Sequence, residues 1–232
     1  MNYYTLFLLF IMYSFLGWLL EVICKLVEKK KFINRGFLIG PICPIYGCGS
    51  ILIILLLERY KSNLFILFGM AIIICSILEY MTSYIMEKLF NLRWWDYSSK
   101  KYNLNGRICL NTMIPFGILG CVVIYIINPF FLSILNNFNI NTVELISIII
   151  FIIFILDITI SFGIIYNFKE SIKNVGDSTE AISKKVKDIL LSRNYVYKRL
   201  IKAFPNIKSP KERLLEIRKR IDNEIKKYNK NI

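Results

Sequence analysis

The sequence of 232 residues contains no histidine. This absence excludes serine-histidine triads, histidine metal ligands and histidine proton relays. Six cysteines are present, but no two of them form a C-x-x-C pair, so we interpret them as small core residues and expect no metal site and no cofactor. The sequence also lacks a G-x-x-x-x-G-K-S/T loop, and the chain therefore cannot bind ATP in the way that P-loop proteins do.

Long apolar stretches dominate what is present. Hydrophobic residues make up 56% of the chain and the mean hydropathy is +0.52, and a run of about 20 apolar residues is long enough to cross a bilayer as a helix. We predict five such helices, at residues 3–25, 40–57, 64–87, 108–127 and 143–166. The expected fold is all-α: a polytopic helical membrane protein with about five transmembrane helices in residues 1–166 and a basic cytoplasmic tail in residues 167–232.

The distribution of lysine and arginine predicts the orientation of these helices. The loops after the first and third predicted helices carry five basic residues each, the loop after the second carries two, and the loop at residues 128–142 carries none. Basic loops stay on the cytoplasmic side of a membrane. We therefore expect the N-terminus outside and the tail inside.

Three carboxylates lie within the predicted helices: Glu21, Glu79 and Asp157. An ionised side chain at the centre of a membrane helix costs about 2.5–3.5 kcal/mol on insertion scales, so such residues usually face a polar cavity, a partner or a substrate. At about 1.5 Å per residue, they lie about 6, 12 and 13 Å from the inner ends of their helices. We predict that they share one inward-open polar pocket. The alternative for Glu21 is that its side chain merely reaches the interface.

A segment rich in glycine and proline separates the first two predicted helices, with Arg35 near its start. Its other distinctive residues are Gly36, Gly40, Pro41, Pro44, Tyr46 and Gly47. Proline breaks a helical ladder, and irregular backbone at membrane depth occurs only where it is buried in protein or lines a wet cavity. The sequence therefore indicates either a broken, re-entrant segment with Arg35 at its mouth or a tight loop followed by a kinked helix.

A second distinctive segment follows the third predicted helix. It reads Trp94-Trp95-Asp96-Tyr97-Ser98 and continues to Asn105-Gly106-Arg107. Paired tryptophans beside a tyrosine are typical of the aromatic belt at a membrane interface. Asp96 and Arg107 add charges of both signs, and the planar guanidinium of arginine fits carboxylate or phosphate groups. An internal ion pair is the favoured interpretation, and a lipid headgroup or an anionic substrate are the alternatives.

These motifs, in this order, resemble the bacterial membrane-protein family named putative ABC-transporter type IV permease. The resemblance covers residues 5–125 and is carried by Leu16-Gly17-Trp18 with Glu21, Arg35-Gly36-Phe37 through Gly40-Pro41, Pro44-Ile45-Tyr46-Gly47, Glu79-Tyr80-x-Thr82-Ser83 through Glu87, Trp94-Trp95-Asp96-Tyr97-Ser98 and Asn105-Gly106-Arg107. It implies a transport function and marks as functional candidates Glu21, Arg35, Glu79, Glu87, Asp96 and Arg107. The basic tail lies outside the resemblance.

The tail at residues 167–232 carries 18 basic and 8 acidic residues, a net charge of +10. Capping residues and apolar residues at helical spacing predict two amphipathic helices that pack as a hairpin. We expect the basic face to meet the anionic inner leaflet. An ATPase or another cytoplasmic protein that docks on the apolar stripes is the alternative. We disfavour nucleic acid as a partner, because a membrane-anchored basic tail usually meets lipid or protein.

The resulting hypothesis is a permease subunit of a bacterial cytoplasmic membrane that works by alternating access to the inward pocket. Because the chain has no phosphate loop, ATP-driven transport would need a separate ATPase subunit, and because five helices are few for a permeation path, we expect a homo-oligomer. One alternative is a membrane-embedded enzyme for a lipid-linked or amphipathic substrate, with Glu79 as acid or base and Arg35 or Arg107 on a phosphate. The other alternative is a scaffold that does not transport.

Overall fold

The computed structural model describes residues 2–173 together with Arg199, Ala203 and Phe204, and it describes side chains at residues 2–166 and at these last three positions. The elements are α1 (Tyr3–Lys29), α2 (Pro44–Leu57), η1 (Glu58–Tyr60), α3 (Leu64–Phe90), β1 (Asn103–Leu104), β2 (Ile108–Cys109), α4 (Leu110–Val122), η2 (Val123–Ile127), α5 (Asn128–Asn136) and α6 (Ile140–Lys173). The predicted helices of the tail lie outside the described residues.

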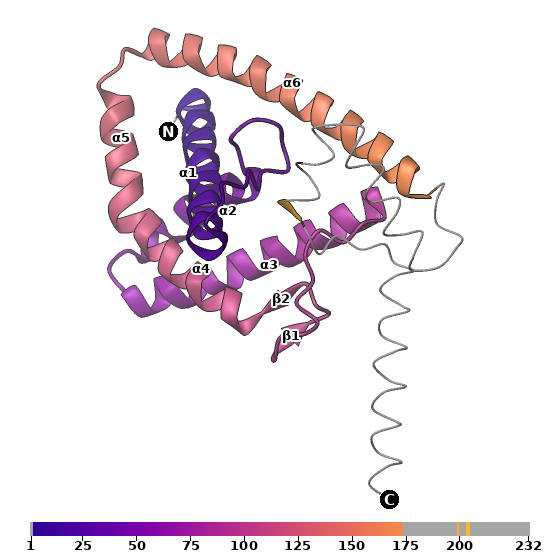
Figure 1. Cartoon of the computed structure of the whole chain (residues 1–232). Helices are drawn as coiled ribbons and strands as arrows, with labels where there is room; N and C mark the ends of the chain where they lie inside the picture. The colour runs from indigo at the N-terminus through magenta and orange to yellow at the C-terminus, as the bar shows by residue number, and fades with distance from the viewer. Residues whose placement is uncertain (1, 174–198, 200–202, 205–232) are drawn as a thin grey trace, which may run out of the picture.

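Four helical stretches in the described part of the chain are long and apolar enough to cross a membrane. They are Tyr3–Lys29, Leu64–Phe90, Leu110–Asn136 and Ile140–Tyr166. Figure 1 shows α6 along the edge of the helical assembly, and most of its apolar side chains are exposed, as expected for a helix that faces lipid. The prediction of an all-α, multi-pass membrane protein is confirmed.

The second predicted helix is shorter than the prediction at residues 40–57. The helix α2 begins at Pro44 and has 14 residues, about 21 Å of helix against a hydrocarbon core of about 30 Å. Pro41 and Pro44 explain the late start, because neither has a backbone N–H to donate and proline suits only the first helical turn. The structure therefore has four full-length helices and one short one.

The helix α2 nevertheless runs antiparallel to α1 and connects the two ends of the assembly. Near its start, Cys43 donates its backbone N–H to Ser14 O at 3.0 Å. Near its end, Leu57 packs in one apolar cluster with Leu8 and Val123. A second cluster, at the other end, contains Phe90 and other residues of the inner loops.

Contacts between loops and helix ends support the alternation of sides that the basic residues predict. Tyr125 donates its hydroxyl to Lys61 O, which joins η2 to the loop after η1. Ser147 donates its hydroxyl to Tyr4 O at 3.4 Å, which joins the start of α6 to the start of α1. The loop after α2 and the turn after α5 thus lie at the end of the molecule that holds the N-terminus.

This arrangement gives a testable topology. Reporter fusions after Asn63 and after Asn137 should report an external location, and a fusion after Lys101 should report a cytoplasmic one, because basic loops remain inside. The measurement is paired alkaline phosphatase and fluorescent-protein activity in intact cells. A cytoplasmic signal from the Asn137 fusion would contradict the predicted orientation.

The predicted loop at residues 128–142 is wrong in its extent. The helix that begins at Leu110 does not end at Ile127. It passes through the π-helical turn η2 and continues as α5 to Asn136. Pro129 explains the irregular turn, because its ring removes a donor and crowds the carbonyl four residues earlier. The wider turn absorbs this proline without ending the helix.

A small antiparallel hairpin, β1–β2, interrupts the otherwise helical fold, and the sequence analysis did not predict it. Asn105 and Gly106 have φ of 52° and 65°, and Arg107 donates its N–H to Leu104 O at 3.0 Å. An Asn-Gly pair with both φ positive is the preferred centre of a type I′ hairpin turn. A Cβ at Gly106 would lie 2.6 Å from Asp96 Oδ1, so only glycine allows this close contact.

Candidate functional site

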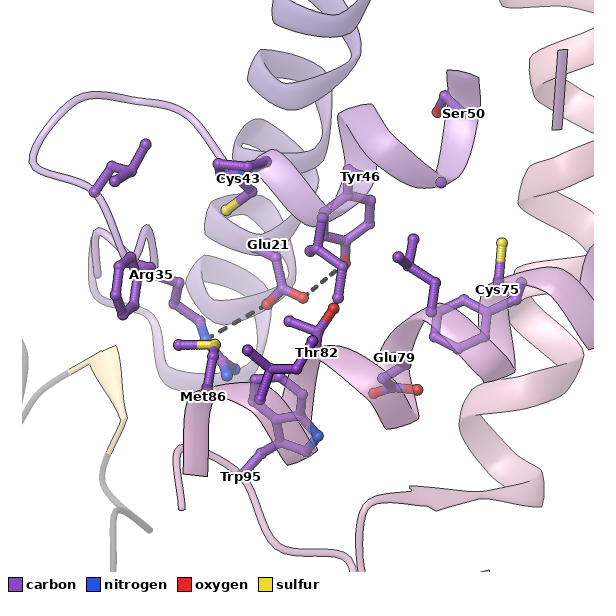
Figure 2. Close-up of a pocket in the computed structure, with 18 of the residues that line it drawn as sticks. Glu21, Arg35, Cys43, Tyr46, Ser50, Cys75, Glu79, Thr82, Met86 and Trp95 are labelled. Carbon is purple, nitrogen blue, oxygen red and sulfur yellow. Dashed lines mark hydrogen bonds and ion pairs between the residues drawn. The ribbon is translucent and has the colours of Figure 1, made fainter. Parts of the chain in front are cut away.

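A cavity of about 520 Å³ lies among α1, α2, α3, α4 and α6, and residues of the loops after α1 and α3 contribute to its lining. Most of the side chains that line it are apolar. Among the described lining residues, the charged ones are Glu21, Arg35 and Glu79 (Figure 2). Glu21 and Glu79 thus line the same cavity.

Glu21 is the centre of a small polar group on one wall of the cavity. Tyr46 donates its hydroxyl to Glu21 Oε1 at 2.8 Å, and Arg35 Nε lies 3.4 Å from Glu21 Oε2. Figure 2 shows Glu21 between these two partners. The absence of a side chain at Gly17, one turn before Glu21, lets the Tyr46 ring lie directly on α1. The glycine thereby positions the phenol toward the carboxylate.

Glu79 is a buried carboxylate on α3 with an 8% exposed side chain. Tyr97 Oη donates to Glu79 Oε1 at 3.4 Å. In the described part of the structure, Glu79 Oε2 has no hydrogen-bond partner. Burial and, to a smaller degree, the nearby Glu79 raise the pKa of Tyr97. The phenol therefore stays protonated and acts as a donor.

Asp157 lies outside the set of cavity-lining residues, contrary to the predicted shared pocket. Its Oδ1 accepts the backbone N–H of Ile39 at 2.9 Å, and its Oδ2 accepts that of Gly40 at 3.0 Å. Ser161 supports the arrangement by donating to Asp157 Oδ1 at 3.1 Å. The carboxylate thus fastens the loop after α1 to α6, and its burial is explained by backbone donors.

The Asp157→Asn variant should loosen this loop, because the amide group would meet one of the two backbone N–H groups with another donor. We expect hydrogen exchange at the amides of Ile39 and Gly40 to accelerate at least tenfold, measured by mass spectrometry of the purified protein. Thr159→Ala, two residues along α6, is the control and should leave the exchange unchanged. Equal protection in the Asn variant and the parent would contradict the fastening role.

The loop after α1 is irregular from residue 32 to Cys43, and Phe37 and Leu38 line the cavity. Gly36, Gly40 and Pro41 lie in this loop, while Pro44, Tyr46 and Gly47 lie in the first turn of α2. Of the two interpretations of this segment, irregular backbone that lines a cavity fits its course.

The segment after α3 forms a buried charge network beside the cavity. Glu87 Oε2 accepts from Arg107 Nη2 at 2.8 Å and from Arg93 Nε at 3.1 Å. Arg93 Nη1 also lies 3.6 Å from Asp96 Oδ1, and Arg107 Nη1 donates to Ser83 Oγ at 3.1 Å. The favoured interpretation, internal ion pairing, agrees with this geometry. Arg93, which the sequence analysis counted only as a basic loop residue, is its most buried cation.

The tryptophans of this segment do not form an exposed aromatic belt. Trp94 is 3% exposed and packs edge to face against Phe37 and Phe204. Trp95 lines the cavity and donates its indole N–H to Arg107 O at 3.0 Å. The belt interpretation is wrong for Trp94, because the loop folds back over the inner ends of the helices instead of lying along the interface.

Two residues of the C-terminal segment, Arg199 and Phe204, lie at the cavity or at the loop that lines it. Arg199 Nη1 donates to Leu38 O at 2.7 Å. Phe204 lines the cavity, and the guanidinium carbon of Arg35 lies 5.9 Å from the centre of the Phe204 ring. The sequence pattern placed Phe204 in an apolar stripe that packs within the tail. No signal in the sequence indicated that it packs on Trp94 instead.

In the part of the chain with described side chains, no three histidine, cysteine, aspartate or glutamate residues gather into a set that could hold a metal ion. The polar groups at the cavity include two carboxylates, the Arg35 guanidinium and the hydroxyls of Tyr46 and Tyr97, together with the hydroxyls of Ser50 and Thr82 and the thiols of Cys43 and Cys75. They suit ion pairing, hydrogen bonding and proton exchange.

Comparison with protein families shows to which family this chain belongs. The profile of the family described as putative ABC-transporter type IV matches residues 8–162. The chain belongs to this family. The match extends beyond the predicted end of the resemblance at residue 125 and includes Asp157, for which the sequence analysis had no motif. Comparison with curated proteins found no match, and comparison with solved structures found none either.

Membership in the ABC-transporter type IV family and the four long apolar helices together make this chain a multi-pass membrane protein related to transporters. The matched region includes Glu21, Arg35, Glu79, and the charge network around Glu87. The tail residues at the cavity mouth lie beyond it.

Proposed function

We propose that this chain is the membrane-spanning permease subunit of a transporter in the cytoplasmic membrane of a bacterium. The observation that carries the proposal is the cavity with charged residues from α1, from α3 and from the loop after α1, on the side of the basic loops. Substrate sites in transporters lie between helices with irregular backbone nearby. The family membership and the irregular loop at residues 32–43 support the same assignment.

The proposed mechanism is alternating access in which the loop after α1 opens and closes the inner mouth. The contacts that hold this loop include the Glu21–Arg35 pair, with 3.4 Å between Arg35 Nε and Glu21 Oε2, and the Asp157 carboxylate on Ile39 and Gly40. Breaking the Glu21–Arg35 pair frees both groups, so a substrate that replaces either partner shifts the loop equilibrium. A ligand can shift such an equilibrium only by its difference in affinity for the two states.

A separate ATPase subunit would supply the energy, since the sequence has no phosphate loop. The four long helices and the short α2 are few for a permeation path, and we propose that a complete pathway forms between two copies. The basic tail, with its net charge of +10, would meet the anionic inner leaflet or the ATPase.

The enzyme alternative has less support from the geometry. It needs Arg35 or Arg107 on a phosphate, yet Arg35 pairs with Glu21, and Arg107 pairs with Glu87 and donates to Ser83. A phosphate would have to displace a carboxylate at either position.

Purification of the full chain from its native membrane in a mild detergent tests the assignment. We expect a subunit with a G-x-x-x-x-G-K-S/T loop in fixed stoichiometry, and ATP hydrolysis by the complex that depends on that loop. Mass spectrometry of the complex and phosphate release are the measurements. A chain that purifies without an ATPase, or a complex that does not hydrolyse ATP, would refute ATP-driven transport.

A further inference from the structure

We propose that the cavity binds an amphipathic amine, with its ammonium group on Glu79 and its apolar body along the cavity walls. The inference names the substrate class for the cavity of the proposed permease and in that sense rests on the proposed function. Its physical argument depends only on the described residues around the cavity.

The first step is the balance of charge. Of the three charged residues described in the lining, Arg35 is paired with Glu21, which also accepts from Tyr46. Glu79 is therefore a second acidic group whose charge no cation in this lining set balances. A carboxylate in an apolar environment is costly unless it is neutralised or paired. A cationic ligand would provide the missing charge.

The second step is the hydrogen bonding of Glu79. The residue is more than nine-tenths buried, its Oε1 has a long hydrogen bond of 3.4 Å from Tyr97, and its Oε2 has no partner within the described structure. An ammonium group has several N–H donors and no acceptor. It can therefore donate a hydrogen bond to Glu79 Oε2 while Tyr97 keeps its hydrogen bond to Oε1.

The third step is the character of the walls. Aliphatic and aromatic residues line the same cavity as Glu79, among them Leu78, Ile85, Phe116, Leu119 and Trp95. Cavities of about 300–1,000 Å³ hold small organic ligands, and such walls bury their apolar parts. Aromatic faces also attract cations. A small inorganic cation would leave these walls empty and would find too few oxygen ligands.

An anionic ligand fits the described site poorly. Its partner would have to be Arg35, which already contacts Glu21 and stacks on Phe204. Glu79 would then repel the anion from within the same cavity. The arrangement therefore favours a ligand with a positive charge.

The test uses three probes with one carbon skeleton: 6-phenylhexylamine, 6-phenylhexanol and 6-phenylhexanoate. Binding to the purified full chain in a nonionic detergent would be followed by isothermal titration calorimetry, without an ATPase. We expect the amine to bind at least tenfold more tightly than the alcohol, and the acid to bind more weakly than the alcohol. If the unmodified protein bound the amine and the alcohol equally, or preferred the acid, the inference would be overturned.

Variants then assign the preference to one residue. Glu79→Gln should reduce the affinity for the amine to that for the alcohol, while Glu58→Gln, at the opposite end of the molecule, should preserve the preference. Retention of the preference in Glu79→Gln would overturn the assignment to Glu79. Because the assay measures binding by the chain alone, its outcome does not depend on the purification test. A chain that purifies without an ATPase and still binds the amine selectively would refute ATP-driven transport and leave this inference intact.

Discussion

The Glu79→Gln variant should lose transport activity while it accumulates in the membrane at the level of the parent protein. Glutamine nearly preserves the shape of glutamate but removes its charge and its ability to exchange a proton. If Glu79 only joined helices, the effect would be modest, because polar contacts between membrane helices average about 0.6 kcal/mol in the best-studied case. Binding of a cation or exchange of a proton requires the carboxylate itself, and we therefore expect complete loss.

Growth or uptake complementation is the measurement, with the membrane level of each variant determined in parallel. Glu144→Gln, a substitution of the same chemistry near the start of α6, is the matched control and should retain activity. Full activity in the Glu79→Gln variant would contradict both the transport mechanism and the enzyme alternative. The scaffold hypothesis would then remain.

Loss of the Glu87 carboxylate should produce the largest loss of stability. Glu87 pairs with Arg93 and Arg107, whose exposed fractions are 3% and 8%. Removal of one partner from a buried ion pair costs about 3–5 kcal/mol, because the remaining charge is left without compensation in a medium of low polarity. Glu87→Gln removes the carboxylate that Arg107 contacts, while Arg93 keeps its contact with Asp96, so we expect a loss within that range.

The measurement is the free energy of unfolding of the purified protein in mixed detergent micelles. Glu28→Gln provides the comparison, because Glu28 forms an ion pair with Lys25 on the surface and surface pairs contribute little. That variant should unfold like the parent. A Glu87→Gln variant as stable as the Glu28→Gln variant would show that the network is not a source of stability.

Hydropathy was sufficient to predict α1, α3 and α6, because a long apolar helix needs no tertiary partner to satisfy its backbone. The start of α2 and the continuation to α5 were harder to predict. A proline can start or end a helix, or the helix can continue past it. Pro44 starts α2, whereas the helix continues past Pro129 into α5. The Asn105-Gly106 pair was a usable signal for the hairpin, which the expectation of an all-helical fold obscured.

The sequence predicted how far along each helix the carboxylates lie, but not which neighbours their side chains contact. Position along a helix put Glu21 and Glu79 at a similar depth, and both line the cavity. The same reasoning failed for Asp157, whose side chain accepts backbone N–H groups from a loop 117 and 118 residues away in the sequence. Arg93 was missed for the same physical reason: contacts between distant segments decide which charge becomes buried, and a single sequence contains no direct record of them.

The packing of Phe204 on Trp94 makes the tail a part of the cavity wall. Any ligand that fits better with Phe204 in place strengthens the contact between the tail and the helices by the same free energy that the contact adds to ligand binding. Ligand binding in the cavity and the contact of Phe204 with the helices are therefore coupled. A cytoplasmic partner that holds the tail would change the affinity of the cavity without touching the membrane helices.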